Sequence, residues 1–293
     1  MRIVSLLPAA TEIVYALGLA DSLVGVTFEC DEPAAARTDH AVVVGGRDTS
    51  GMTPAEIDAY VRAQAAAGAD LYHLHRDALR TLQPDLVLSQ DLCRVCALPA
   101  ERVDEALAFL GCRAEVVALD PYSLDDVLAT IATVARAAGV AARGDTVRAA
   151  LRARLDAVAT AVAGRPRPRV AVVEWVDPPF AAGHWIPDLV RAAGGEPVAA
   201  TPHERSGPTT WAALAAAAPD VVVVAPCGFG LDGAAAQAAT VGRELPHAAI
   251  WAVDGDGLIV RPGPRLVDGV EALAGIFHPE FARGRAESVR RVR

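Results

Sequence analysis

Apolar runs and helical apolar stripes alternate along the chain, and they occur in a similar order twice. The first half opens with RIVSLL at 2–7, followed by Pro8 and a stretch with helical apolar spacing, TEIVYALGL. The second opens with RVAVVEW at 169–175, then DPPF and the helical stretch IPDLVRAAGG. Each half later repeats a helix, a Pro-Asp pair and an apolar strand, in LRTLQPDLVLSQ and LAAAAPDVVVVAP. Buried parallel strands are continuous apolar runs, so the pattern predicts an α/β protein of two Rossmann-like lobes with mostly parallel sheets.

Two helices without a strand signal are predicted between the halves. Ser123 can cap the first, with Asp126 at its third position, and Gly139 ends it. The second, a backbone helix from Asp145 to Ala163, would be about 27 Å long and would join the lobes as a rod that limits their motion. The alternative is that both helices pack within one domain. The expected parts are an N-terminal lobe at 1–142, a linker helix at 143–165 and a C-terminal lobe at 166–293.

Composition narrows the class of protein. A hydrophobic fraction of 53% is enough for two cores, and a formal net charge of -9 argues against a nucleic-acid partner, which would require a concentrated basic face. The basic C-terminal segment RGRAESVRRVR is expected to be a frayed tail. Nucleic-acid binding is therefore not expected.

The sequence predicts neither a membrane span nor an export signal. The apolar run after Met1 is interrupted by Pro8 and Glu12, and no run approaches the roughly 18 residues of a span. We therefore expect no membrane insertion and a cytoplasmic location, or a periplasmic or cell-surface one if the true start lies upstream. Five cysteines fit reduced thiols, of which Cys112 and Cys227 are interpreted as core residues.

One segment favours a different class of protein. In DLCRVC, Cys93 and Cys96 follow a predicted strand, and such a pair at a helix start favours redox exchange or metal binding. A zinc site would also need His73, His75 or Cys30 to converge. A thiol-based redox or metal-dependent enzyme is thus the alternative. Otherwise no hydrolase elbow, Walker loop or dinucleotide fingerprint is present, so no enzyme is expected.

Four segments together resemble a known family. They are RIVSLLPAATEIVYALGLADSLVGVT, PDLVLSQ, WVDPPFAAGHWIPDLVRAAGG and VRPGPRLVDGVEALAGIFHP. In this order they resemble the helical-backbone (class III) substrate-binding proteins of ABC importers of vitamin B12, haem and ferric siderophores. The cobalamin-binding branch is the most similar, chiefly through DPPF. The resemblance implies a non-catalytic monomer that needs no cofactor and binds cobalamin, another corrinoid or an iron chelate between its lobes.

The resemblance also implies which residues contact the ligand, by loops at the carboxyl ends of strands. The expected contacts are Ser5, Pro8, Ala9, Ala10, Thr11, Glu29 and Cys30 in the first lobe, and Trp175, Trp185, Asp256 and Arg261 in the second. Indoles would supply rigid apolar area, and Arg261 would reach peripheral amides or carboxylates. The alternative for both tryptophans is simple packing.

An ABC transporter permease is the partner that the resemblance implies. Family members present one acidic residue on each lobe, seven positions before the Pro-Asp pair, for docking to the permease. Asp77 stands at this distance before Pro84, whereas Ala212 stands there before Pro219. One of the two expected docking charges is absent.

Overall fold

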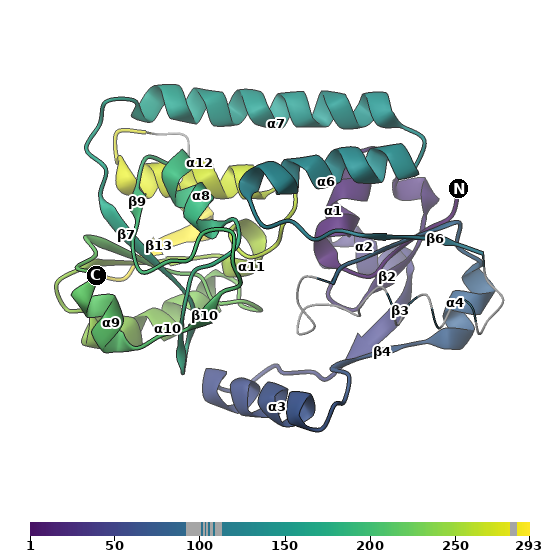
Figure 1. The fold of residues 1–293 in the computed structure, drawn as a ribbon, viewed down its shortest axis with the longest axis horizontal. Helices are drawn as coiled ribbons and strands as arrows, with labels where there is room; N and C mark the ends of the chain where they lie inside the picture. The colour runs from purple at the N-terminus through teal and green to yellow at the C-terminus, as the bar shows by residue number, and fades with distance from the viewer. Residues whose placement is uncertain (92–100, 102, 104, 106–107, 109–112, 282–285) are drawn as a thin grey trace. The chain divides into compact units, whose positions relative to one another are not determined.

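The structure, a computed structural model, describes residues 1–91, 101, 103, 105, 108, 113–281 and 286–293 (Figure 1). It divides into two compact units, which are taken separately below. Unit 1 contains 1–121 and 128–149, and unit 2 contains 122–127 and 150–293. Two of the boundaries between the units, at 127/128 and 149/150, fall inside helices rather than in loops.

Unit 1 is built on a six-stranded sheet in the order β4-β3-β2-β1-β5-β6. All neighbouring strands are parallel except β4, which runs antiparallel to β3 at the edge. The strands are β1 (Ile3–Ser5), β2 (Leu23–Thr27), β3 (Ala41–Gly46), β4 (Tyr72–Leu74), β5 (Leu86–Ser89) and β6 (Glu115–Ala118). The helices of the unit whose bounds the structure describes are α1 (Pro8–Ala16), α2 (Ala35–Asp39), α3 (Pro54–Ala66) and α4 (Arg76–Leu82), with a short 3-10 turn at Ala20–Ser22.

Unit 2 contains a second sheet in the order β10-β8-β7-β11-β12-β13, with β9 also paired to β7. Its centre is parallel, and β8, β10 and β13 add antiparallel strands. The strands are β7 (Arg169–Val176), β8 (Pro179–Ala181), β9 (Glu196–Pro197), β10 (Gly207–Pro208), β11 (Val221–Val224), β12 (Ala249–Val253) and β13 (Val289–Arg291). The helices are α8 (Ile186–Ala192), α9 (Trp211–Ala216), α10 (Leu231–Glu244), α11 (Gly255–Leu258) and α12 (Leu266–Phe277), with a 3-10 turn at Ala286–Ser288.

The predicted α/β class with mostly parallel sheets is confirmed. The valine run of β11 is buried along its whole length because both of its neighbours are parallel strands and α10 packs over it. Ala234, Ala238 and Val241 of α10 belong to the same apolar cluster as β11. Among the described residues, no helix combines the length and apolarity that crossing a bilayer requires.

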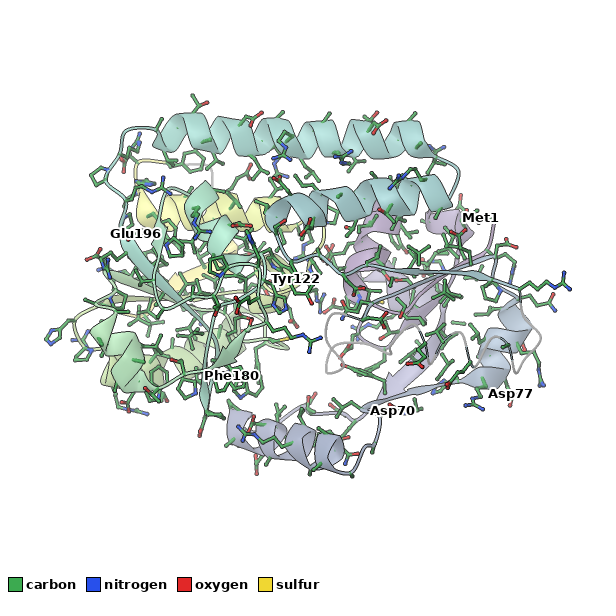
Figure 2. All side chains as sticks on the ribbon, in the orientation of Figure 1. Met1, Asp70, Asp77, Tyr122, Phe180 and Glu196 are labelled. Atoms are coloured by element: carbon green, nitrogen blue, oxygen red, sulfur yellow. The ribbon has the colours of Figure 1, made fainter. Side chains whose placement is uncertain are left out.

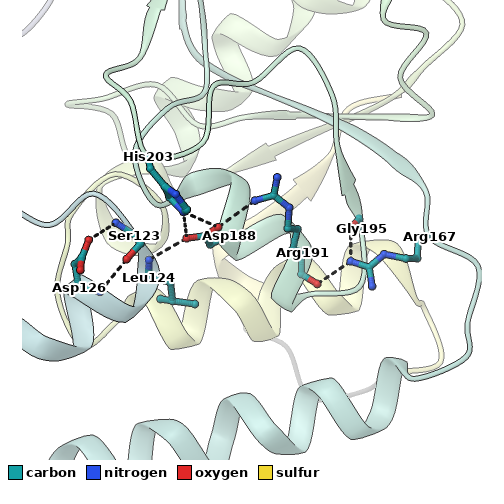
Figure 3. Close-up of polar contacts among 8 residues, drawn as sticks. All are labelled: Ser123, Leu124, Asp126, Arg167, Asp188, Arg191, Gly195 and His203. Carbon is teal, nitrogen blue, oxygen red and sulfur yellow. Dashed lines mark hydrogen bonds and ion pairs between the residues drawn. The ribbon is translucent and has the colours of Figure 1, made fainter.

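The two helices predicted between the halves are α6 (Leu124–Ala137) and α7 (Ala141–Val162), each with residues in both units. Ser123 caps α6 as predicted, since its hydroxyl accepts from the Asp126 amide at 3.1 Å while the Asp126 carboxylate accepts from the Ser123 amide at 2.9 Å (Figure 3). The α7 helix begins before the predicted Asp145. It includes Gly144, where a Cβ would lie 2.5 Å from that of Ala135, so this glycine lets the two helices pack closely.

The prediction of a frayed C-terminal tail is wrong. Val289–Arg291 forms β13, which pairs antiparallel with β12, and Arg290 bonds to Asp232 at 2.9 Å. The edge of β12 supplies backbone partners that a basic composition does not reveal.

Candidate functional site

In unit 1 the loops after β1 and β2 lie at the same sheet edge, because these neighbouring strands are parallel. Ser5 ends β1, and α1 starts at Pro8, whose fixed φ suits a first helical position. The Thr11 hydroxyl donates to the Ser5 hydroxyl at 2.8 Å and lies 3.0 Å from the Cys30 sulfur. Ser5 in turn donates to the Leu7 carbonyl at 2.9 Å. The predicted residues from the two loops therefore meet.

Their burial limits what they can contact. Ser5, Thr11 and Cys30 are fully buried, and Ala9 and Ala10 have almost no exposed surface. Their polar groups bond to one another, so they fix the path of the chain around Pro8, which is half-buried. Ser5, Thr11 and Cys30 therefore stabilise the conformation of the loop.

Glu29 lies beside aromatic residues that the sequence did not suggest. Tyr72, on β4, donates its hydroxyl to the Glu29 carboxylate at 3.1 Å, and its ring centroid is 6.1 Å from that of Phe28. A Cβ on Gly46 would lie 2.8 Å from the Phe28 ring, so the glycine leaves room for the aromatic side chain. Because β4 is an antiparallel edge strand, sequence spacing alone gave no sign that Tyr72 reaches this edge.

The candidate metal ligands are partly outside the described residues. His73 and His75 are exposed, with ring centroids 5.0 Å apart, as expected for an extended segment. Across the residues that the structure does describe, no three His, Cys, Asp or Glu side chains gather in a way that could hold a metal ion. Cys93 and Cys96 lie outside the described residues, as does Cys112.

In unit 2 the carboxyl ends of β7, β11 and β12 form one sheet edge. Trp175 is half-buried near the end of β7, and its indole nitrogen donates to the Asp177 carbonyl at 3.1 Å. Phe180 of β8, labelled in Figure 2, is its cross-strand partner. The ring centroid of Phe229, in the loop after β11, is 5.8 Å from that of Trp175. Trp175, Phe180 and Phe229 therefore form an aromatic group at this edge of the sheet.

Asp256 and Arg261 follow β12 and are paired with each other. Arg261 donates to Asp256 at 3.4 Å, and their side chains are 14% and 24% exposed. The other Asp256 oxygen accepts the Gly228 amide of the β11 loop at 2.9 Å. The pair thus offers both a donor and an acceptor at the sheet edge while it holds the loop that carries Phe229.

Trp185 differs from Trp175 in its surroundings. It is 4% exposed, and its indole nitrogen donates to the Ile259 carbonyl at 2.9 Å, which matches the packing alternative. His184 lies between Trp185 and Tyr122, with ring centroids 5.4 and 5.7 Å away. Burial lowers the pKa of His184, and the nearby charge of Arg205 lowers it further. A neutral imidazole at neutral pH follows.

A polar cluster on unit 2 ties α6 to α8. The Asp188 carboxylate accepts from the Leu124 amide at 3.2 Å and lies 3.1 Å from the His203 ring nitrogen (Figure 3). Burial opposes ionisation of Asp126, but hydrogen bonds from Ser123 and the Tyr122 amide outweigh it and lower the pKa of this carboxyl. The cluster satisfies amides at the start of α6 and is structural.

The interpretation of Cys227 as a core residue is wrong, because its side chain is exposed. It stands in the PCGFG loop, where Gly228 adopts a φ of +81° that favours glycine. Sequence reasoning also missed Phe229 in the same loop. The signal was the aromatic residue between two glycines directly after a buried strand.

The chain is similar to proteins that bind solutes. The family described as periplasmic binding protein matches residues 3–245. The cobalamin-binding protein of Halobacterium salinarum is 26% identical over 287 residues, covering 94% of this chain and 69% of that protein. An uncharacterized ABC transporter substrate-binding lipoprotein of Bacillus subtilis, YvrC, is 24% identical and covers 95% of this chain and 80% of that protein.

A solved structure agrees with these sequence matches. The periplasmic heme-binding protein BhuT in complex with two hemes is 26% identical, with a TM-score of 0.67 over 96% of this chain and 99% of that chain. The resemblance inferred from the sequence is confirmed by these matches. Since the family match spans most of the chain and the fold agrees with it, the chain belongs to the periplasmic binding protein family.

Proposed function

We propose that this protein binds a corrinoid as the substrate-binding component of an ABC importer. The observation that carries the proposal is the aromatic group around Trp175 at the carboxyl edge of unit 2, with the Asp256–Arg261 pair on the same edge. Aromatic side chains supply rigid apolar area for a large ring, and the pair supplies polar contacts at its periphery. The cobalamin-binding relative from Halobacterium salinarum supports this ligand.

Haem is the second candidate, because the BhuT structure contains it. The charge at the site favours the corrinoid. Haem carries carboxylates at its edge, and these would meet the negative charge of Asp256 beside Arg261. A corrin ring carries neutral carboxamides, and each can accept from the guanidinium and donate to the carboxylate. The formal net charge of -9 for the whole chain also disfavours a ligand with carboxylates at its edge, such as haem.

The ligand is cargo in this proposal rather than a cofactor, and the protein is a non-catalytic monomer. Its partner would be a permease, as the YvrC relative suggests. Asp77, labelled in Figure 2, is suited to docking because its side chain is 90% exposed on α4, where it forms an ion pair with Arg80 at 2.8 Å. Ala212 is also exposed, so the matching position in unit 2 has no charge to offer. Placement of the ligand between the lobes stays a prediction.

The test is a titration of the purified protein with cyanocobalamin, cobinamide, haem and a ferric siderophore. Tryptophan fluorescence and ligand absorbance are followed together, and the ligands are recovered afterwards to check for turnover. The proposal expects saturable binding of the corrinoids at micromolar concentration or below, at one per chain, with the ligand recovered unchanged. Preferential binding of haem would support the second candidate, and chemical conversion of the corrinoid would contradict a purely binding role.

A further inference from the structure

Phe229 is a residue of the unit 2 edge that the predictions from the sequence did not include. It lies between β11 and α10, at the carboxyl end of a central parallel strand. Its ring is half-buried, and it meets the Trp175 ring at an interplanar angle of 55°. Two rings tilted in this way cannot both lie flat on one macrocycle. One can meet a face while the other meets an edge.

The Phe229 side chain rests on the first turn of α10. A Cβ on Gly233 would lie 2.7 Å from the Cδ1 atom of Phe229 and 3.1 Å from its Cβ. Real side chains essentially never come so close, so the aromatic ring keeps this position only because residue 233 is glycine. Glycine is otherwise unfavourable inside a helix compared with alanine. The presence of glycine at this helical position, despite its cost in helix stability, is consistent with a need to leave space for the Phe229 ring.

Contacts with the residues at the start of α11 also hold the loop that carries Phe229. The Gly228 amide donates to Asp256 at 2.9 Å. A Cβ on Gly255 would lie 2.5 Å from the Pro226 carbonyl oxygen, so the start of α11 packs closely on the same loop. The second oxygen of Asp256 pairs with Arg261 at 3.4 Å. Asp256 therefore connects the loop after β11 with the segment that carries Arg261 after β12.

We propose that Phe229 is a ligand-contacting residue that forms, with Trp175, a two-walled aromatic corner, and that Asp256, in addition to the polar contact proposed above, positions this corner. The inference rests on the proposed function. In it, the Trp175 ring lies against the face of the corrin and Phe229 contacts its edge. Gly233 leaves the space that the Phe229 ring occupies. Asp256 acts through the hydrogen bond that it accepts from the Gly228 amide.

The decisive experiment moves the Phe229 ring without removing it. Gly233→Ala should lower the affinity for cyanocobalamin about tenfold, as Phe229→Ala should, since buried aromatic contacts dominate binding sites. Gly233→Ala should leave the protein folded, with a melting temperature close to that of the wild type, because the helix propensity of alanine offsets part of the cost of displacing the ring. Gly242→Ala is the matched control in the same helix, where a new Cβ would meet the nearest side-chain atom at an ordinary 3.8 Å. It should leave the affinity unchanged.

Asp256 is tested by a pair of substitutions. Asp256→Asn keeps an acceptor for the Gly228 amide and should retain more affinity than Asp256→Ala, which removes it. Equal losses in the two variants would overturn the positioning role. Unchanged affinity in both Phe229→Ala and Gly233→Ala, with wild-type binding that still depends on Trp175, would overturn the aromatic corner alone. Absence of corrinoid binding by the wild-type protein would instead overturn the proposed function.

Discussion

The hydroxyl of Thr11 should stabilise unit 1 without contacting the ligand. Thr11→Val removes a buried hydroxyl that donates to Ser5 at 2.8 Å and lies 3.0 Å from the Cys30 sulfur. Loss of buried hydrogen bonding of this kind costs about 1–3 kcal/mol in the free energy of unfolding. For a unit of this size, each kcal/mol lowers the melting temperature by roughly 2–4 °C. Because Thr11 is fully buried, we expect the affinity for cyanocobalamin to change less than about threefold.

Calorimetry and fluorescence titration at 25 °C measure the two effects separately. Thr11→Ser is the matched control, because it keeps the hydroxyl and removes only a methyl group, so its melting temperature should fall less than that of Thr11→Val. The reasoning would be refuted by a Thr11→Val protein that melts like the wild type but binds cyanocobalamin more than about tenfold more weakly. In that case the hydroxyl contacts the ligand, as the family resemblance implied.

Two further predictions concern stability. Arg154 of α7 bonds to Asp268 at 2.5 Å and to Glu271 at 2.7 Å on α12, so Arg154→Met removes both of these ion pairs. Since the arginine side chain is 39% exposed, we expect a loss of only about 1–2 kcal/mol, measured by urea unfolding. Burial lowers the pKa of His184 in the folded protein, so the unfolded chain binds more protons and stability falls as the pH drops below about 6.5. His184→Gln should reduce this slope in urea midpoints measured from pH 7.5 to 5, with a residual slope from His278, whose pKa burial also lowers; an unchanged slope would contradict the assignment.

The fold was largely predictable because its signals are local. Continuous valine runs predicted the parallel centre of unit 2, and the cap at Ser123 was visible from one residue and its third neighbour. The antiparallel strands were missed for the opposite reason. The pairing of β13 with β12 joins residues about forty positions apart, and a basic composition says nothing about a free sheet edge.

The candidate site was predictable only in outline. The positions of Ser5 and Cys30 in unit 1, and of Trp175 in unit 2, follow from strand ends, because each parallel sheet brings the carboxyl ends of its own strands to one edge. Sequence could not separate contact from support, since this depends on burial, and Thr11 and Trp185 are buried with internal hydrogen-bond partners. Nor could it place Phe229 beside Trp175, because that contact depends on the backbone path permitted by a glycine in the next helix.

The central claim is that a corrinoid binds against Trp175. Equilibrium dialysis of cyanocobalamin against the wild-type protein and Trp175→Ala, read by corrin absorbance, tests it most directly. The account predicts one bound corrinoid per chain for the wild type and an affinity lower by about 1–3 kcal/mol for the variant, the usual range for a buried aromatic contact. Retention of no corrinoid by the wild type at micromolar concentration, or equal retention by both proteins, would contradict it.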